Sequence, residues 1–395
     1  MKKIAVVTAT RAEYGILRPL IYRLQEETEF ELQLIVTGMH LSEKYGNTQA
    51  EIEKDKIPVF KKIPILEDGN SAYDISVTMA NALCRFAGYF RDEKPDMVIV
   101  LGDRTEILGI CAAAMNEGIP IAHLHGGELT EGAVDDCIRH AVTKMSYLHF
   151  TASETYRKRV IQLGESPDRV FNVGALGVEN IPGMGNVSGL PAKNILHTQL
   201  FSYEDMCREI GIPNDQKYVV VTFHPVTQEP GEEEHQTQEL IAAMREKSGY
   251  FYLITKANAD AGGQRVNELL ENFSEKVPNA KLVSSLGMVR YLSALKYSEF
   301  ALGNSSSGMI EAPALGIPTV NIGERQRGRL MADTIVQCKP EKEQILEAMD
   351  EAAVMPHRVS TLYGDGETSS KIVAILKNFL FNNKINLKKK FYDLE

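Results

Sequence analysis

Residues 97–106 read Met-Val-Ile-Val-Leu-Gly-Asp-Arg-Thr-Glu, an apolar run that ends in a glycine and an acid. Five consecutive apolar residues predict a strand buried on both faces, which is typical of a parallel sheet covered by helices. Amphipathic segments at 74–91 and 105–117 flank this run, and both predict helices. A buried strand between two helices indicates an α/β fold whose polar residues gather where the strands end.

The same alternation extends in both directions along the chain. Further strands are predicted in the first half at Ile4–Thr8, Leu32–Thr37, Ile119–Leu124 and His149–Thr151. A Gly- and Pro-rich stretch at 181–191 predicts a linker. After it the pattern restarts, with predicted strands at Tyr218–Phe223, Tyr250–Thr255, Lys281–Ser284, Phe300–Leu302 and Thr319–Ile322.

These patterns predict two doubly wound Rossmann-type domains, residues 1–180 and 190–367, with a cleft between them at the carboxyl ends of both sheets. A helix at about Ser370–Phe381, within the C-terminal segment 368–395, is expected to pack back on the first domain. The charged tail Lys384–Glu395 is expected to be a solvated end. The length of 395 residues fits two domains.

Composition excludes several classes of protein. The formal net charge of −10 argues against a nucleic-acid binder, which needs a basic face. A few arginines and backbone N–H groups can nevertheless hold a diphosphate in an acidic protein. No run approaches the roughly 18 apolar residues that a membrane helix needs, and the apolar N-terminal run is too short for a signal peptide. The five cysteines are widely spaced and form no CxxC motif, so reduced thiols in a cytoplasmic protein fit best.

Two of the predicted strands end in charged residues. Arg11 follows the first strand and could clamp a phosphate at a helix N-terminus, or it could be an ordinary surface arginine. Asp103 follows the strand at 97–101 and could face the cleft as a catalytic acid. Because Glu106 comes three residues later, Asp103 could instead cap the next helix, and the local pattern alone favours the cap.

The segment after the next strand is the densest polar stretch in the chain. Gly126 and Gly127 would let the backbone approach a ligand closely. Around them lie His123, His125, Glu128, Asp135, Asp136, Arg139 and His140. The His-x-His pair could bind a metal ion, but the position of a third ligand is uncertain, so we expect no metal site. Arg139 and His140 are expected in the following helix, where they could simply brace the loop.

The second half offers an anion site. His224 follows the strand at 218–223, and Asn258 lies in the loop after the next strand. Gly303-Asn-Ser-Ser-Ser-Gly308 runs from a strand into a helix, where free N–H groups and hydroxyls could cradle a phosphate. A plain serine N-cap is the alternative. Glu311, expected one turn inside that helix, suits a ribose diol better than a phosphate, and Arg325, Arg327 and Arg329 follow the next strand. The GxGxxG, GxxxxGK[ST] and GxSxG motifs are all absent, which removes the strongest signals for dinucleotide, P-loop and serine-hydrolase chemistry.

Eight stretches occur in a distinctive order: Thr-Arg-Ala-Glu-Tyr-Gly (10–15), Val-Thr-Gly-Met-His (36–40), Gly-Asp-Arg (102–104), His-Gly-Gly-Glu (125–128), Asp-Asp-Cys-Ile-Arg-His (135–140), Phe-His-Pro-Val-Thr (223–227), Gly-Asn-Ser-Ser-Ser-Gly (303–308) and Gly-Glu-Arg-Gln (323–326). Together they resemble the UDP-N-acetylglucosamine 2-epimerase family, which has the GT-B fold, over nearly the whole chain. The form of the His-Gly-Gly-Glu run resembles the hydrolysing branch, the bacterial enzymes of sialic-acid synthesis.

The resemblance implies a defined reaction. A base removes the C2 proton of the sugar while UDP leaves C1, which gives a glycal. Water then adds at C1 and C2 is reprotonated from the other face, releasing N-acetylmannosamine. This chemistry requires positioned acid–base groups and cations near the diphosphate, but neither a redox cofactor nor a metal. The family also implies a homo-oligomer.

The resemblance carries roles to individual positions. Asp103 matches a catalytic acid or base, Asp135 or Asp136 matches an essential acid, and His224 should touch the diphosphate or assist the departure of UDP. Several relatives have Glu at the position of His125, so either His125 or Glu128 takes that role here; a neutral imidazole can act as a base near pH 7. The implied substrate contacts are Arg11, Arg104, Glu179, Asn258, Ser305, Ser306, Ser307, Gly308, Glu311 and Arg325.

Several functions remain open on the sequence alone. Within the family, the substrate could be a UDP- or GDP-linked 2,4-diacetamido-2,4,6-trideoxy sugar that feeds legionaminic acid. Outside it, a GT-B glycosyltransferase, a non-catalytic nucleotide-sugar sensor and a His-x-His metal hydrolase are the alternatives. A sensor would tolerate the loss of acids such as Asp103, whereas all of these acids are present.

Overall fold

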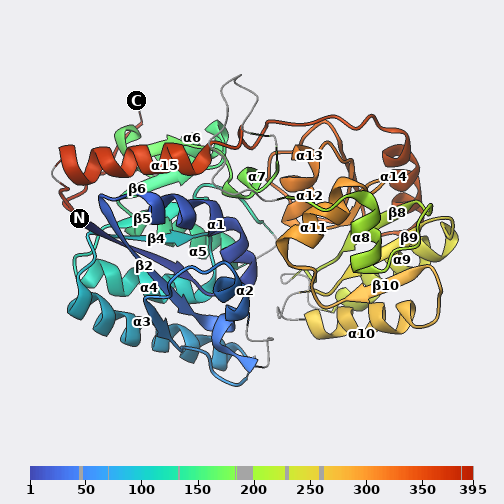
Figure 1. The fold of residues 1–395 in the computed structure, drawn as a ribbon, viewed down its shortest axis with the longest axis horizontal. Helices are drawn as coiled ribbons and strands as arrows, with labels where there is room; N and C mark the ends of the chain where they lie inside the picture. Colours follow the sequence, from blue (N-terminus) through green and yellow to red (C-terminus); the bar gives the residue numbers. More distant parts are fainter. Residues whose placement is uncertain are drawn as a thin grey trace. The chain divides into compact units, whose positions relative to one another are not determined.

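A computed structural model describes residues 1–43, 48–69, 71–131, 134–182, 184, 199–226, 231–257, 262–383 and 385–394. The chain divides into two compact units (Figure 1). Unit 1 comprises Met1–Glu128, Asp135–His197 and Gly364–Glu395, and unit 2 comprises Leu129–Val134 and Thr198–Tyr363. Most of the predicted linker at 181–191 lies outside the described residues.

Unit 1 is built on a parallel sheet of seven strands in the order β3-β2-β1-β4-β5-β6-β7. The strands are β1 (Lys2–Thr8), β2 (Phe30–Thr37), β3 (Lys61–Ile63), β4 (Met97–Leu101), β5 (Ile121–Leu124), β6 (Leu148–Thr151) and β7 (Val170–Asn172). The order reverses direction beside β1, so β1 and β4 pair at the topological switch point where α/β sheets bind ligands.

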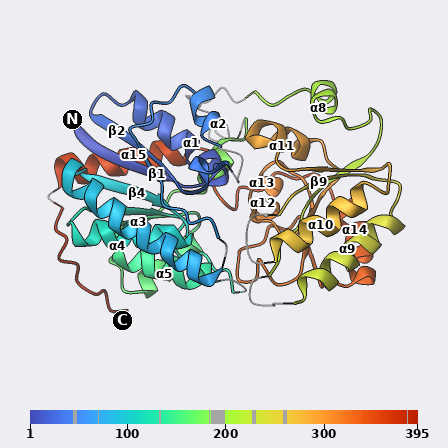
Figure 2. The same cartoon turned by 90° about the horizontal axis from the view of Figure 1, so that it is seen from below.

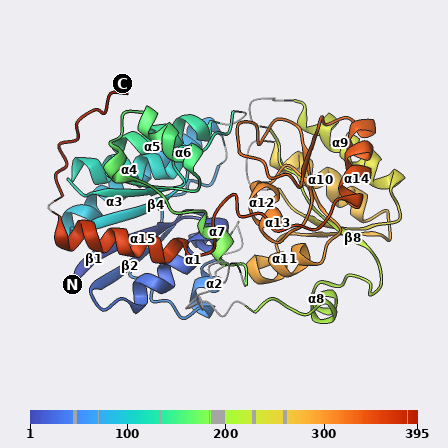
Figure 3. The same ribbon diagram turned by 90° about the horizontal axis from the view of Figure 1, so that it is seen from above.

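Helices cover both faces of this sheet, as Figures 2 and 3 show. Alternate residues of β1 point to opposite faces: Ile4 and Val6 pack with α1 and α15, whereas Ala5 and Val7 pack with α3, α4 and α5. The helices of unit 1 are α1 (Arg11–Glu26), α2 (Gln49–Lys54), α3 (Ala72–Glu93), α4 (Thr105–Asn116), α5 (Asp135–Met145), α6 (Glu154–Gln162), α7 (Leu176–Glu179) and α15 (Thr368–Lys377), with short 3-10 turns at Gly38–Leu41 and Pro167–Arg169.

Unit 2 repeats the design with a parallel sheet of six strands in the order β10-β9-β8-β11-β12-β13. The strands are β8 (Tyr218–Thr222), β9 (Phe251–Thr255), β10 (Ala280–Val283), β11 (Ala301–Gly303), β12 (Thr319–Ile322) and β13 (Ile335–Cys338). Val219 and Val221 of β8 pack with α9, α10 and α14, while Tyr218 and Val220 pack with α8 and α11. The helices are α8 (Tyr203–Ile210), α9 (Glu233–Glu246), α10 (Gly263–Ser274), α11 (Gly287–Lys296), α12 (Ser306–Met309), α13 (Glu311–Ala314) and α14 (Lys342–Val354).

The expected pair of α/β domains with buried parallel sheets is therefore confirmed. Helix α15 and the π turn that follows it, Asn378–Asn382, cover the stretch where a C-terminal helix was predicted, at about 370–381. The C-terminal tail differs from its prediction. The tail beyond it is not simply a solvated end, because Lys389 lies against unit 1 and bonds to the buried Glu165. No helix in the described part of the chain is long and apolar enough to cross a membrane.

Candidate active site

Asp103 lies at the carboxyl end of β4, in the turn that follows Gly102. Gly102 has a φ of +72°, a conformation that glycine adopts without a steric cost. Helix α4 begins at Thr105 with Arg104, not Asp103, as its N-cap, and the N-cap side chain makes no capping hydrogen bond. The interpretation of Asp103 as a helix cap is therefore wrong, because its carboxylate is directed to another partner.

That partner is Arg139 of α5, whose side chain is only 1% exposed. Its guanidinium donates to Asp103 Oδ2, to Asp136 Oδ1 at 3.1 Å and to the carbonyl oxygen of Glu128 at 2.9 Å. A planar guanidinium presents several donors in a fixed fork, so one side chain can hold all three acceptors in a set geometry. From the sequence, Arg139 was expected only to brace the loop. In the structure it is the residue that joins Asp103, Asp136 and the Glu128 carbonyl.

Arg139 brings two acids together that are 33 residues apart in the sequence. The side chains of Asp103 and Asp136 remain about one quarter exposed, at 25% and 23%. Two neighbouring carboxylates repel one another, and the buried cation offsets that repulsion. The result is a pair of accessible acid–base groups at the edge of the sheet. Asp135 is the first residue of the same helix.

His125 and Glu128 form a second acid–base pair beside the first. Nδ1 of His125 lies 2.8 Å from Oε1 of Glu128, which is only 2% exposed. His125 adopts a φ of +63°, which is rare for a residue with a side chain. Its Nε2 has no hydrogen-bond partner among the described residues. A carboxylate that binds one imidazole nitrogen fixes the tautomer and leaves the other nitrogen for chemistry.

Gly127 and His123 of the same polar stretch have structural roles. Gly127 has a φ of +80°, and a Cβ atom there would lie 2.4 Å from the carbonyl oxygen of Tyr156 in α6, so this glycine permits close packing against α6. The sequence analysis had attributed it to the approach of a ligand. His123 is fully buried, with its ring nitrogens 3.2 Å from Thr143 Oγ1 and 2.8 Å from the carbonyl oxygen of Gly102. Burial lowers the pKa of His123 to about 3. Among the described residues, no group of three potential metal ligands is found.

Arg11 and Arg104 lie where β1 and β4 end. Arg11 is the first residue of α1, and its Nη1 lies 3.4 Å from Glu51 Oε1. Nε of Arg104 donates to Glu106 Oε1 at 2.8 Å. Both arginine side chains are about one third exposed, at 34% and 35%, so both cations remain accessible to an anion.

Glu13 is a residue of this edge that the sequence analysis did not single out. Its Oε2 accepts from the backbone N–H of Ala9 at 3.0 Å, and its Oε1 has no partner among the described residues. Burial raises the pKa of Glu13 to about 7, against the opposing effect of Arg104. The signal in the sequence was its place in Thr-Arg-Ala-Glu, directly after the strand.

Glu179, expected near the sugar, is 8% exposed in the short helix α7. Its two carboxylate oxygens accept from the N–H of Ser369 at 2.7 Å and from the Ser369 hydroxyl at 2.5 Å. Glu179 therefore holds the first turn of α15 in place. Its contact with a sugar stays a prediction.

In unit 2, the ends of β8 and β11 meet around Asn304, which is 1% exposed. Asn304 Oδ1 accepts from the N–H of His224 at 2.7 Å, and its Nδ2 donates to the carbonyl oxygen of His224 at 2.8 Å. The carbonyl oxygen of Asn304 accepts from Arg325 Nη1 at 3.2 Å and from Gln326 Nε2 at 2.8 Å. One asparagine thus joins the histidine to the arginine loop after β12.

His224 itself is 6% exposed, and burial together with the nearby Arg325 lowers its pKa to about 3. The imidazole is therefore neutral at pH 7 in the free protein. Asn304 and Gln326 were quoted within the sequence motifs, but neither was singled out as a site residue. Their buried side chains and long-range partners show that they position His224 and Arg325.

The serine run forms one helical turn rather than the start of a long helix. Ser305 is the N-cap of α12 and accepts from the N–H of Ser307 at 3.3 Å, as the serine-cap alternative expects. Ser306, Ser307 and Gly308 make up the first turn. The helix breaks at Ile310, and Glu311 begins α13, so its expected place one turn inside a continuous helix is wrong. Asn258 lies outside the described residues.

Residues 22–377 match the family model described as UDP-N-acetylglucosamine 2-epimerase. The chain belongs to this family. It is 40% identical over 336 residues, 85% of this chain and 84% of the relative, to the GDP/UDP-N,N'-diacetylbacillosamine 2-epimerase (hydrolyzing) of Campylobacter jejuni. It is 38% identical over 400 residues, 100% of this chain and 98% of the relative, to the polysialic acid biosynthesis protein P7 of Escherichia coli.

The fold agrees with that of a solved family member. The UDP-GlcNAc 2-epimerase of Neisseria meningitidis, solved bound to UDP-GlcNAc, superposes with a TM-score of 0.77 at 19% identity and covers 95% of this chain and 99% of that chain. The family and the GT-B-like fold inferred from the eight sequence stretches are therefore confirmed, and the chain is an enzyme of the epimerase family.

Proposed function

We propose that this protein is a hydrolysing 2-epimerase that converts UDP-N-acetylglucosamine and water to N-acetylmannosamine and UDP. The observation that carries the proposal is the buried Arg139, which holds the carboxylates of Asp103 and Asp136 side by side and partly exposed. The reaction needs one group to take a proton from C2 and another to return a proton from the opposite face. Paired acids within one site suit that work.

In the proposed first step, a base takes the C2 proton, the C–H electron pair forms the C1–C2 double bond, and UDP leaves C1 with its bonding pair. In the second step, water adds to C1 of the glycal and gives up a proton to a base, while an acid delivers a proton to C2. The candidates for these transfers are Asp103, Asp135, Asp136 and the His125–Glu128 pair. The hydrogen bond between His125 and Glu128 supports His125 as the group that reacts and Glu128 as the group that orients it.

The leaving diphosphate needs cations and N–H donors. In unit 1 we assign this role to Arg11 and Arg104. In unit 2 we assign it to Ser305–Gly308, Arg325 and His224, whose neutral ring in the free protein could gain a proton when a diphosphate lies against it. Glu311 and Asn258 are proposed contacts of the nucleoside, and Glu179 of the sugar side.

A second substrate is supported by the Campylobacter relative, which is named for N,N'-diacetylbacillosamine carried on GDP or UDP. The chemistry at C1 and C2 would be the same for that 2,4-diacetamido sugar, and the pocket around C4 and C6 would decide between the two. The relative named for polysialic acid biosynthesis has nearly the same identity, 38% against 40%. Both substrates therefore belong in the first assay.

The deciding experiment is incubation with each sugar nucleotide in deuterated water, followed by proton NMR. Free N-acetylmannosamine with deuterium at C2 is the expected product from UDP-GlcNAc. Turnover of the diacetamido sugar nucleotide alone would reassign the substrate, and accumulation of UDP-ManNAc would contradict hydrolysis.

The matched variants are Asp103→Asn and Asp92→Asn. Because general acid–base groups contribute roughly 10²- to 10⁴-fold to rate, Asp103→Asn should lose turnover while its affinity for UDP changes little. Asp92, whose side chain is 57% exposed, is the control and should tolerate the same change. Full activity in Asp103→Asn would remove Asp103 from the reaction.

A further inference from the structure

Helix α5 carries Asp135, Asp136 and Arg139 in its first five residues, and its other end is held by a residue from the far C-terminus. The ammonium of Lys389 donates to the carbonyl oxygens of Lys144 and Ser146, both at 2.7 Å. Carbonyl groups at a helix C-terminus lack partners within the helix and carry partial negative charge. Lys389 therefore supplies both the donors and the positive charge that this end of α5 requires.

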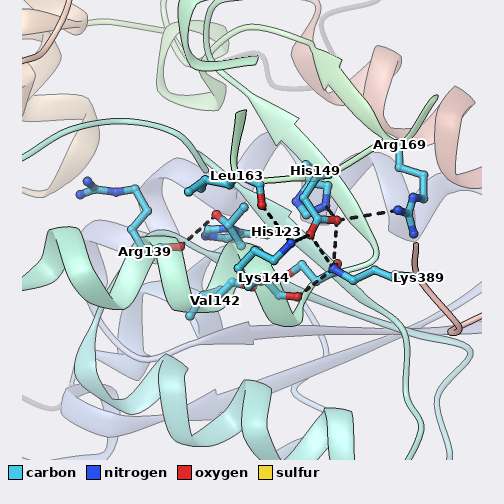
Figure 4. A network of polar contacts seen from close by, with 11 residues as sticks. His123, Arg139, Val142, Lys144, His149, Leu163, Arg169 and Lys389 are labelled. Carbon is cyan, nitrogen blue, oxygen red and sulfur yellow. Dashed lines mark hydrogen bonds and ion pairs between the residues drawn. The ribbon is translucent and has the colours of Figure 1, made fainter. Parts of the chain in front are cut away.

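The same ammonium is fixed from its other side by a buried carboxylate. Both oxygens of Glu165 lie 2.9 Å from Lys389 Nζ, and the Glu165 side chain is only 1% exposed. Glu165 also receives hydrogen bonds from Lys144 and from His149, which is fully buried (Figure 4). Burial alone would raise the pKa of Glu165, but hydrogen bonds from His149, Lys144 and Lys389 hold it at about 2. The carboxylate that anchors Lys389 is therefore ionised at neutral pH.

The residues that follow Lys389 also pack against unit 1. The N–H of Tyr392 donates to the carbonyl oxygen of Gly164 at 3.0 Å. The ring of Phe391 covers Gly164 so closely that a Cβ atom there would lie 2.3 Å from the ring. Lys144 Nζ lies 5.1 Å from the centroid of the same ring. In contrast, the neighbouring Lys388 and Lys390 are exposed, so one lysine of the three is selected for the anchor.

An α-helix of 11 residues is a stiff rod of roughly 16 Å, so a shift at one end moves the other. At the first end of α5, Arg139 binds Asp103 and Asp136 with a fixed fork that a small displacement would break. We propose that Lys389 is a positioning residue for the candidate active site: by holding the C-terminal end of α5, it sets where Arg139 and Asp136 meet Asp103. The proposal rests on the proposed function for its kinetic consequence, but the coupling along α5 can be tested without it.

The test compares full-length Lys389→Met with Lys390→Met, which removes an equal charge from the adjacent exposed position. Hydrogen exchange by mass spectrometry follows the amides at 136–142, and kinetics follow kcat and KM separately. In Lys389→Met we expect exchange at 136–142 to accelerate at least tenfold, and kcat to fall about tenfold while KM changes less than twofold. Lys390→Met should match the wild type in all three.

A tail that merely covers the surface would give a different result. Wild-type exchange at 136–142 and wild-type kcat in a folded Lys389→Met protein would overturn the proposal. If Lys389→Met does not fold, Phe391→Ala, which leaves every charge in place, takes its position: a lower kcat at unchanged KM supports the proposal and a wild-type kcat overturns it. If the wild type turns over no sugar nucleotide, the proposed function fails, while exchange at 136–142 still decides the role of Lys389.

Discussion

Asn304 holds the backbone of His224 from both sides, with its Oδ1 2.7 Å from the His224 nitrogen and its Nδ2 2.8 Å from the His224 carbonyl oxygen. The two residues are 80 positions apart and follow the ends of the adjacent strands β8 and β11. The side-chain amide of Asn304 thus bonds the two backbone groups of His224 that a neighbouring strand would bond if β8 and β11 continued. It fixes the backbone conformation from which the His224 side chain projects.

Replacing Asn304 with Ala should weaken nucleotide binding and destabilise unit 2. Each buried backbone group left without a hydrogen-bond partner costs about 1–3 kcal/mol. The change would leave two such groups, the N–H and the carbonyl oxygen of His224, without the Asn304 side chain. We expect a lower melting temperature and an affinity for UDP at least tenfold weaker, measured by calorimetry. Asn272→Ala, on the exposed face of α10, is the control. Unchanged UDP affinity in a folded Asn304→Ala protein would show that His224 needs no such support.

Replacing Arg139 with Lys keeps the charge but loses the planar fork. An ammonium cannot reach Asp103, Asp136 and the Glu128 carbonyl in the same geometry. Misplacement of a reacting group by about 1 Å can cost roughly 100-fold in rate, so we expect kcat to fall by about that factor. The affinity for UDP should change little, since Arg139 is not one of the proposed diphosphate contacts.

The control for this change is Arg157→Lys, because Arg157 of α6 donates to Glu154 and to the carbonyl oxygen of Val170 in β7 and contacts neither Asp103 nor Asp136. It should retain kcat. A wild-type kcat in Arg139→Lys would mean that charge alone, and not the geometry of the guanidinium, holds the two carboxylates.

Glu13 should make stability depend on pH. Its pKa is raised by burial from an ordinary 4.5 to about 7, so the folded protein binds a proton that the unfolded chain releases between those values. Stability is therefore lost as pH rises from about 4.5 to about 7, by roughly 1.4 kcal/mol for each pKa unit at most. Glu13→Gln cannot ionise and should escape this loss.

The measurement is the melting temperature of wild type and Glu13→Gln at pH 5 and pH 8. The melting temperature of Glu13→Gln minus that of the wild type should be higher at pH 8 than at pH 5. Glu154→Gln, at an exposed position of α6, should show no such gain. An equal difference at both pH values would contradict the raised pKa of Glu13.

The long buried strands could be predicted because each is a run of apolar residues with helices on either side. The two edge strands of unit 1 could not: β3 reads Lys-Lys-Ile, with its two lysines exposed, and β7 reads Val-Phe-Asn. Neither has enough apolar residues for a pattern to emerge. These segments are strands because they pair with the neighbouring strands β2 and β6, and not because their residues have a high β propensity.

The individual site residues were predictable as members of motifs, but their partners were not. Arg139 and Asp103 are 36 residues apart, and the choice of Asp103 as a partner rather than a cap depends on where α5 packs. Only the spacing of Asp136 and Arg139, three apart on one helix, was visible in advance. Similarly, three consecutive lysines at 388–390 give no indication that the middle one is selected by Glu165.

Gly303 should not tolerate any side chain. It ends β11 with a φ of +134°, and a Cβ atom there would lie 2.0 Å from the carbonyl oxygen of Thr222 on β8. Backbone cannot move aside as a flexible side chain can, so the two strands would have to separate and Asn304 would lose His224. Gly303→Ala should therefore lower the melting temperature sharply and abolish UDP binding. Gly249→Ala adds the same methyl group where nothing lies within 4 Å, and it should leave both unchanged. A folded Gly303→Ala protein that binds UDP normally would show that the close approach of β8 and β11 is not needed to place His224.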